Sequence, residues 1–242
     1  SLIIGRRFKI VLVSFGREII EVTTFRGHHE RDNNSSYENK DTDSNKDSDN
    51  NGDSDENYEN PGNRRQDSAR DDAGMLLRDN VYGSIEEDAI RRDFTVNALY
   101  YAVKDFSVHD FCNGVDDLKH RVLRIIGDPE TRYREDPVRM LRAVRRAAKL
   151  EFSIEPATAS PVFSLCSLLH NVPPARLFDE TLKLFMAGHG VATFELLRHF
   201  GLFEQLFPDT SAQLDNGSNL ELVVTALEGT DRRINEGKTV TP

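Results

Sequence analysis

A long polar segment divides this chain of 242 residues. Residues 31–73 are rich in Asp, Asn, Ser and Gly, contain almost no aliphatic side chains, and carry 13 acidic and 6 basic groups, which accounts for most of the chain's net charge of −10. Such a segment cannot bury enough apolar surface to offset the entropy lost on ordering, so we expect a disordered surface insertion. The core must therefore come from the sequence on either side. The acidic balance, being local to the insertion, does not exclude polyanion binding by the folded part.

The sequence before the insertion predicts an antiparallel hairpin. Residues 7–13 and 18–25 are rich in β-branched side chains, and Gly16-Arg17 between them is a turn signal. Glu21 falls in the middle of the second predicted strand. A carboxylate there either faces water or meets a positive partner such as a magnesium ion, and both interpretations stay open.

The sequence after the insertion predicts a helix and then short strands. Residues 84–87 have the Ser-x-x-Glu spacing of a capping box, which marks a helix start. We expect a second hairpin over residues 100–111 and a strand over residues 123–126. The helix is expected to continue along an apolar face made of Ile90, Phe94, Ala98 and Tyr101.

The pattern becomes helical near residue 130. Asp136 is a candidate N-cap, with Pro137 at the favoured first helical position. The predicted fold class is α+β, with a mainly antiparallel head over residues 1–127 and a helical region over residues 128–242. The apolar stripe of the first long helix is Met140, Leu141, Val144, Ala147 and Ala148, and further helical patterns cover residues 158–170, 176–187, 190–200 and 218–228.

Two charged runs stand out against these apolar patterns. In the first, Arg91-Arg92-Asp93, the arginines either pair locally with the carboxylate or hold triphosphate oxygens. In the second, Asp136 precedes a basic row made of Arg139, Arg142 and Arg146. That row is either a solvated helix face or a surface for phosphate and base. An Asp and an Arg one turn apart offer an acceptor and a planar donor fork, which can read the edge of a nucleobase.

Cysteine usage and hydropathy exclude several other classes. Cys112 and Cys166 are the only cysteines and form no CxxC or Cys/His spacing, so neither a disulfide framework nor a structural zinc site is expected, and a reducing cytoplasm fits. No apolar run approaches the roughly 18 residues that a membrane span needs.

Taken together and in order, the motifs resemble the bacterial poly(A) polymerase and tRNA nucleotidyltransferase family, within the DNA polymerase β-like superfamily. The resemblance covers nearly all of the chain except the insertion, and its first two motifs are more similar to the poly(A) polymerase branch than to the CCA-adding branch. The motifs that carry it are Gly5-Arg6-Arg7-Phe8, residues 18–26, Arg91-Arg92-Asp93-Phe94-Thr95, residues 126–129, residues 134–145 and residues 173–180.

The resemblance implies a fold, a reaction and a set of roles. A palm-like nucleotidyltransferase head would be followed by a helical neck and body. The RNA 3′-hydroxyl would attack the α-phosphate of ATP and release pyrophosphate, with two magnesium ions bridging the attacking and leaving oxygens. The implied roles are Glu21 as metal ligand and catalytic group, Asp93 as catalytic group, Arg91 and Arg92 at ribose and phosphates, Asp136 and Arg139 at the base with Arg142 beside them, and Arg146 and Arg176 at RNA.

The sequence departs from the family pattern in several respects. The glycine-rich turn and the Asp-x-Asp pair that precede Gly5 in the family are not in this sequence, so we expect the 242-residue chain by itself to be inactive. Arg146 stands where an aromatic residue is usual. Two alternative functions stay open: a CCA-adding tRNA nucleotidyltransferase, and a non-catalytic module that binds RNA or nucleotides.

Overall fold

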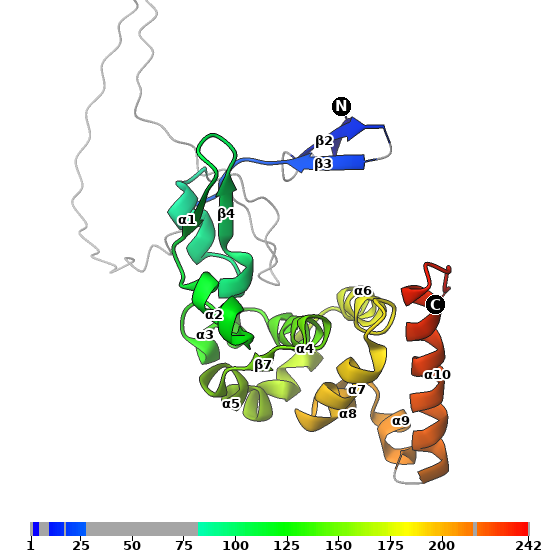
Figure 1. Ribbon diagram of the computed structural model, residues 1–242. Helices are drawn as coiled ribbons and strands as arrows, with labels where there is room; N and C mark the ends of the chain where they lie inside the picture. Colours follow the sequence, from blue (N-terminus) through cyan, green and yellow to red (C-terminus); the bar gives the residue numbers. More distant parts are fainter. Residues whose placement is uncertain (1, 5–9, 17, 28–81, 215–216, 242) are drawn as a thin grey trace, which may run out of the picture. The chain divides into compact units, whose positions relative to one another are not determined.

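The computed structural model describes residues 2–4, 10–16, 18–27, 82–214 and 217–241 (Figure 1). The chain divides into two compact units, Ser1–Asp88 and Ala89–Pro242. The predicted disorder of residues 31–73 lies outside the described residues, as do residues 5–8 of the first family motif.

The first unit contains a three-stranded antiparallel sheet in the order β1-β2-β3. The predicted hairpin is confirmed: β2 pairs with β3, and Gly16 between them has a positive φ of 61°, which glycine adopts at little cost. Glu21 lies on β3 opposite Leu12 and is exposed. The strands are β1 (Leu2–Ile4), β2 (Ile10–Phe15) and β3 (Glu18–Val22).

The capping box is confirmed, but the helix it starts is shorter than predicted. The Ser84 amide donates to Glu87 Oε2 at 2.6 Å and the Glu87 amide donates to Ser84 Oγ at 3.2 Å. Helix α1 (Ile85–Ile90) then ends before the arginine pair. The prediction of one helical face running on to Tyr101 was therefore wrong.

In place of the predicted continuation of α1, residues 93–95 pair with residues 124–126. The Ile126 amide donates to the Asp93 carbonyl and the Thr95 amide donates to the Arg124 carbonyl, each at 3.0 Å, so that Phe94 forms an antiparallel bridge with Ile125. Phe94 is fully buried and belongs to the main hydrophobic core. A short 3₁₀ helix, η1 (Thr95–Asn97), follows.

The second predicted hairpin is confirmed as β4 (Leu99–Ala102) and β5 (Ser107–Asp110). The predicted strand over residues 123–126 shrinks to β6 (Val122–Leu123), which pairs in parallel with β7 (Ser153–Ile154). Four short helices were not predicted: α2 (Gly114–His120), α3 (Pro129–Glu135), α8 (Leu202–Leu206) and α9 (Pro208–Gln213).

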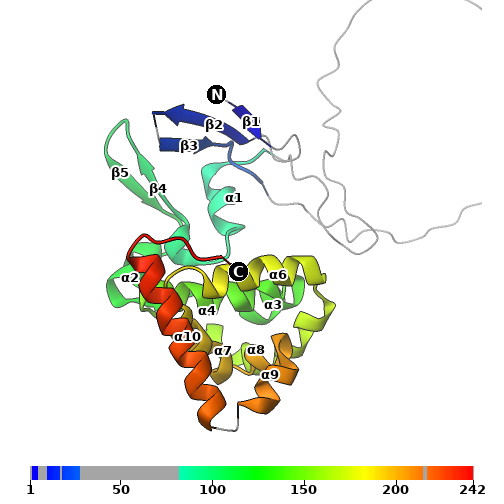
Figure 2. The ribbon, with the colours of Figure 1, turned by 90° about the vertical axis from the view of Figure 1, so that its right-hand side faces the viewer.

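The remaining helices form the body of the second unit (Figures 1 and 2). The predicted α4 stripe is buried at every position. α4 begins at Val138 with Pro137 as its N-cap, so the N-cap predicted at Asp136 was one residue too early. The Asp136 carboxylate still accepts the Val138 amide at 3.2 Å. The helices are α4 (Val138–Leu150), α5 (Pro156–Leu165), η2 (Cys166–Asn171), α6 (Pro174–Phe185), α7 (Gly190–His199), α8 (Leu202–Leu206), α9 (Pro208–Gln213) and α10 (Gly217–Asn235).

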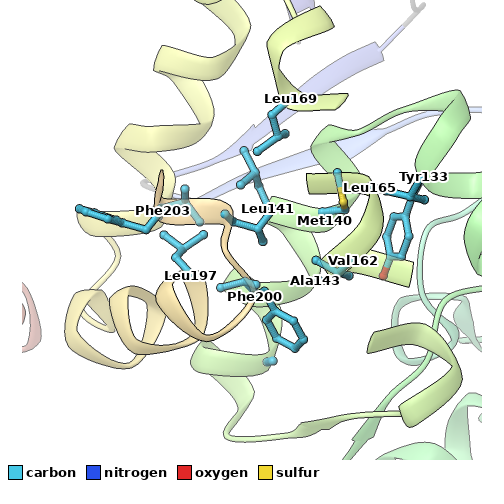
Figure 3. Close-up of a cluster of buried hydrophobic side chains, with 14 of the residues drawn as sticks. Tyr133, Met140, Leu141, Ala143, Val162, Leu165, Leu169, Leu197, Phe200 and Phe203 are labelled. Atoms are coloured by element: carbon cyan, nitrogen blue, oxygen red, sulfur yellow. The ribbon is translucent and has the colours of Figure 1, made fainter. Parts of the chain in front are cut away.

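The main hydrophobic core lies around α4, where side chains from α3, α5, η2, α7 and α8 converge on it (Figure 3). Met140 and Leu141 on α4 are fully buried, and Leu197 on α7 packs into the same cluster. This packing holds α4 rigidly, so the charged side chains on its other face have defined positions. Within the part of the chain that the structure describes, none of the helices has the length and apolarity needed to cross a bilayer.

Candidate functional site

The two charged sequence motifs meet in the second unit. Arg139 Nε donates to Asp93 Oδ1 and Arg142 Nη1 donates to Asp93 Oδ2, each at 2.9 Å. We call Asp93, Arg139 and Arg142 the Asp93 clamp. The Asp93 side chain is only 16% exposed and that of Arg139 only 13%. The clamp is therefore a largely desolvated charge cluster, in which charge-assisted hydrogen bonds are strong.

The electrostatics of the clamp follow from its geometry. Burial acts to raise the pKa of Asp93, but the Arg139 hydrogen bond and the positive charge of Arg142 outweigh it and hold the pKa below the ordinary value of 3.8. The same carboxylate raises the pKa of Arg142 against the effect of burial. Asp93 is thus kept ionised and bound to two guanidinium groups.

Local structure explains why the three groups meet. The bridge between Phe94 and Ile125 fixes the backbone of Asp93. Arg139 and Arg142 are three residues apart on α4, so both side chains leave the helix on one side. The basic row is therefore not a uniformly solvated face, because its first two members are bound to Asp93.

Arg132 supports the same segment, and no role was predicted for it. Its Nη2 donates to the carbonyls of Arg91 and Arg92 at 3.1 and 2.9 Å and lies 3.9 Å from Asp93 Oδ1. The side chain is mostly buried. Its place on α3, a helix that the apolar periodicity did not predict, is the reason that the sequence pattern gave no signal for it.

Arg91 and Arg92 lie in the turn after α1 and not within a helix. Arg92 Nε donates to the Tyr100 hydroxyl at 3.0 Å, and its Nη1 donates to the Asn97 carbonyl at 3.1 Å. The guanidinium also lies over the Tyr100 ring, 5.1 Å from the centroid. Arg92 is therefore held in place by the η1–β4 segment.

Asp136 is bound to α6. Arg176 Nη2 donates to Asp136 Oδ2 at 2.7 Å, and Arg142 Nη1 lies 3.9 Å from the same oxygen. Arg139 binds Asp93 and not Asp136. The two residues that were predicted to read the base together therefore bind different partners in the structure. Arg142 therefore binds Asp93, the predicted catalytic carboxylate, and also lies near Asp136, the carboxylate predicted to read the base.

Glu180 extends the cluster, and no role was predicted for it either. Its side chain is 6% exposed; Lys183 Nζ donates to Oε1 at 2.9 Å, and Arg145 Nη1 lies 3.9 Å from Oε2. Arg146 lies one turn beyond Arg142 with its guanidinium 5.8 Å from the centroid of the Phe94 ring. The approach of arginines from α4 to a buried carboxylate on α6 cannot be inferred from local periodicity.

The described side chains do not provide the predicted metal site. Glu21 lies on β3 in the first unit, and among the described residues no group of three or more His, Cys, Asp or Glu side chains could hold a metal ion. Asp93 is bound by two arginines, which compete with a cation for its oxygens. Glu21 and Asp93 by themselves do not make up a two-magnesium centre, so we derive no step through magnesium.

The sequence matches two family models. Residues 1–124 match the poly A polymerase head domain, and residues 151–214 match the probable RNA- and SrmB-binding site of polymerase A. Together with the mixed helix and small-sheet architecture, the head-domain match confirms the predicted fold class.

Curated relatives and a solved structure agree with these models. The chain is 49% identical to poly(A) polymerase I of Salmonella typhimurium and 47% identical to that of Haemophilus influenzae, each over 99% of this chain, and spans about half the length of either (46% and 47%). Identity to the CCA-adding enzyme of Levilactobacillus brevis is 39% over 60% of this chain and 38% of that protein.

The structure resembles that of the Bacillus stearothermophilus CCA-adding enzyme in complex with CTP, with a TM-score of 0.56 and 25% identity over 82% of this chain and 38% of that one. Poly(A) polymerases and CCA-adding enzymes are both nucleotidyltransferases. The motifs quoted above, the head-domain match and the identity along 99% of the sequence lead to one conclusion: the chain belongs to the poly(A) polymerase family of nucleotidyltransferases.

Proposed function

We propose that the protein containing this sequence transfers AMP from ATP to the 3′-hydroxyl of RNA and releases pyrophosphate. One observation carries the proposal: similarity to poly(A) polymerase I extends over 99% of the chain at 47–50% identity, whereas similarity to CCA-adding enzymes falls to 36–39% over 52–62% of it. The alternatives are CCA addition to tRNA and RNA or nucleotide binding without transfer.

In this proposal the nucleotide lies against the charged cluster of the second unit. Asp136 and Arg139 read the base, with Arg142 beside them, and Arg91 and Arg92 contact ribose and phosphates. The proximity of these groups around Asp93 supports one common site. The arginines outnumber the carboxylates in the cluster, which favours an anionic substrate.

Asp93 is expected from the family resemblance to be catalytic, and its contacts support a positioning role. It holds both Arg139 and Arg142 by hydrogen bonds, so it sets the direction of the guanidinium proposed to read the base. Glu21 remains proposed as a catalytic group and metal ligand, on the resemblance alone. Magnesium held there would supply electrostatic stabilisation of the transferring phosphate.

We further propose that the protein acts in the reducing cytoplasm, and that its head covers residues 1–127 and its helical RNA-binding region residues 128–242. Cys112 and Cys166 are both free thiols, which supports the first proposal. The head-domain match ends at residue 124 and helix α3 begins at Pro129, which supports the second. RNA 3′ ends and ATP are the proposed partners.

Product sequencing tests the proposed function. The full product of the gene that encodes this sequence is incubated with an oligoribonucleotide and magnesium, first with ATP alone and then with ATP and CTP together. We expect adenylate tails in both mixtures, because poly(A) polymerases need no CTP. Addition of C, C and A to a tRNA lacking its end would establish the CCA-adding alternative. RNA binding without any transfer would establish the non-catalytic one.

A further inference from the structure

A cationic pocket lies between α4 and α6, beyond the residues proposed to read the base. Its volume is about 430 Å³, within the range of roughly 300–1,000 Å³ that is usual for ligand sites. The polar lining is made by Arg145, Arg146, Lys149 and Lys183, and Leu182 and Met186 supply an apolar wall. A pocket of this size holds more than a single phosphate group.

The positive charges of this pocket are only partly neutralised. Glu180 is the carboxylate bound to its lining, 2.9 Å from Lys183 Nζ and 3.9 Å from Arg145 Nη1. Arg146 Nε is buried and has no hydrogen-bond partner among the described residues. Burial, and next the charge of Arg145, lower the pKa of Arg146. An anion in the pocket would relieve both the repulsion and the missing hydrogen bond.

Two features favour a strand over a small free anion. Lys149 and Lys183 are exposed, so the cationic rim is open to a chain that continues on either side. The apolar wall lies beside the cations, an arrangement that suits a phosphate joined to a ribose and a base. The choice of RNA as the strand rests on the proposed function.

We propose that this pocket binds one nucleotide unit of the RNA strand, with the phosphate at Arg145, Arg146, Lys149 and Lys183 and the ribose or base against Leu182 and Met186. The pocket is a separate site from the Asp136 and Arg139 pair. It would hold RNA during successive additions without reading the incoming nucleotide.

The test removes charge from the rim and measures RNA affinity against salt. Lys149→Gln with Lys183→Gln leaves the half-buried arginines in place, and both lysine side chains are exposed. Lys183→Gln also removes the cation bound to Glu180, so circular dichroism first verifies that the double variant is folded. Dissociation constants for a single-stranded oligoribonucleotide are measured by fluorescence anisotropy on the full gene product. We expect weaker binding, and a slope of log K against log salt that is shallower by up to about 0.7, because the pocket is proposed to neutralise one phosphate and each neutralised phosphate of a single strand contributes roughly 0.7.

The matched control is Lys104→Gln with Lys119→Gln, which changes the net charge equally at exposed positions on the β4–β5 turn and on α2. We expect it to leave the slope within about 0.2 of the parent protein, well below the shift for one lost phosphate. The same shift in both double variants, or in neither, would overturn the proposal.

A second measurement separates RNA from free nucleotide. With RNA saturating, the KM for ATP should be unchanged in the rim variant; a raised KM with unchanged RNA affinity would mean that the pocket holds a free triphosphate and would refute the RNA assignment. Binding is measured without turnover, so a protein that transfers no AMP yet shows the slope change would refute the proposed function while supporting the pocket.

Discussion

Replacing Asp93 with alanine is expected to lower the free energy of unfolding by about 3–5 kcal/mol, the usual cost of breaking a buried ion pair by removing one partner. The substitution leaves Arg139 and Arg142 without their 2.9 Å acceptors. Arg132, 3.9 Å from the same carboxylate, loses its attraction as well. Because these guanidinium groups are largely buried, water cannot fully replace the lost contacts.

Urea unfolding of the full protein, followed by circular dichroism, measures this loss. Asp179→Ala is the matched control, because Asp179 lies exposed on α6 and its removal should change stability by no more than about 0.5 kcal/mol. If Asp93→Ala and Asp179→Ala lost equal free energies of unfolding, the stabilising role of the Asp93 clamp would be contradicted. The loss in free energy of unfolding for Asp93→Asn should lie between those of the other two variants, because an amide oxygen still accepts one hydrogen bond but carries no charge.

The stabilisation from Asp93 should also depend on pH. Its pKa in the folded protein is below the ordinary value of 3.8. A carboxyl group with a lowered pKa stabilises the fold above its unfolded pKa, and that stabilisation is lost as the pH falls through the folded value. Between pH 7 and pH 5 the difference in stability between the parent and Asp93→Ala should therefore stay constant. It should shrink below about pH 4, and a difference that grew in acid would contradict this assignment.

Asp136→Asn is expected to reduce the preference for ATP over other nucleoside triphosphates by about 10- to 100-fold, which corresponds to the roughly 1.5–3 kcal/mol of one charge-assisted hydrogen bond. Asparagine keeps an oxygen that can accept the Val138 amide, so α4 should still begin at the same place. RNA affinity should change much less than nucleotide preference. The measurement is kcat/KM for ATP, CTP and GTP with the full gene product.

Arg176→Gln provides the control for this variant. This substitution removes the donor of the 2.7 Å hydrogen bond to Asp136 and leaves the Asp136 carboxylate itself unchanged. If Asp136 reads the base, Arg176→Gln should retain most of the preference for ATP. An equal loss in both variants would show that the bond between Asp136 and Arg176, and not recognition of the base by the carboxylate, sets the preference. Unchanged preference in Asp136→Asn would refute the base-reading role.

Local patterns predicted the elements whose contacts lie close in sequence. The capping box at Ser84, the turn at Gly16, the hairpin near residues 100–111 and the buried stripe of α4 all depend on neighbours within a few residues. The same patterns failed after Ile90, where apolar spacing predicted a continuing helix. There the backbone of Asp93 to Thr95 pairs with residues 124–126, and these long-range hydrogen bonds outweigh helical propensity.

The sequence by itself determined the family and most of the residues proposed for the site, because the order and chemistry of the charged motifs are specific. Only the tertiary structure decided how those residues combine. Asp93 meets Arg139 and Arg142 across 46 and 49 residues, and Asp136 meets Arg176 across 40. Local sequence periodicity cannot predict contacts between residues that lie so far apart in the sequence. They arise because the core around α4 brings the turn after α1 and the start of α6 to the same face of that helix.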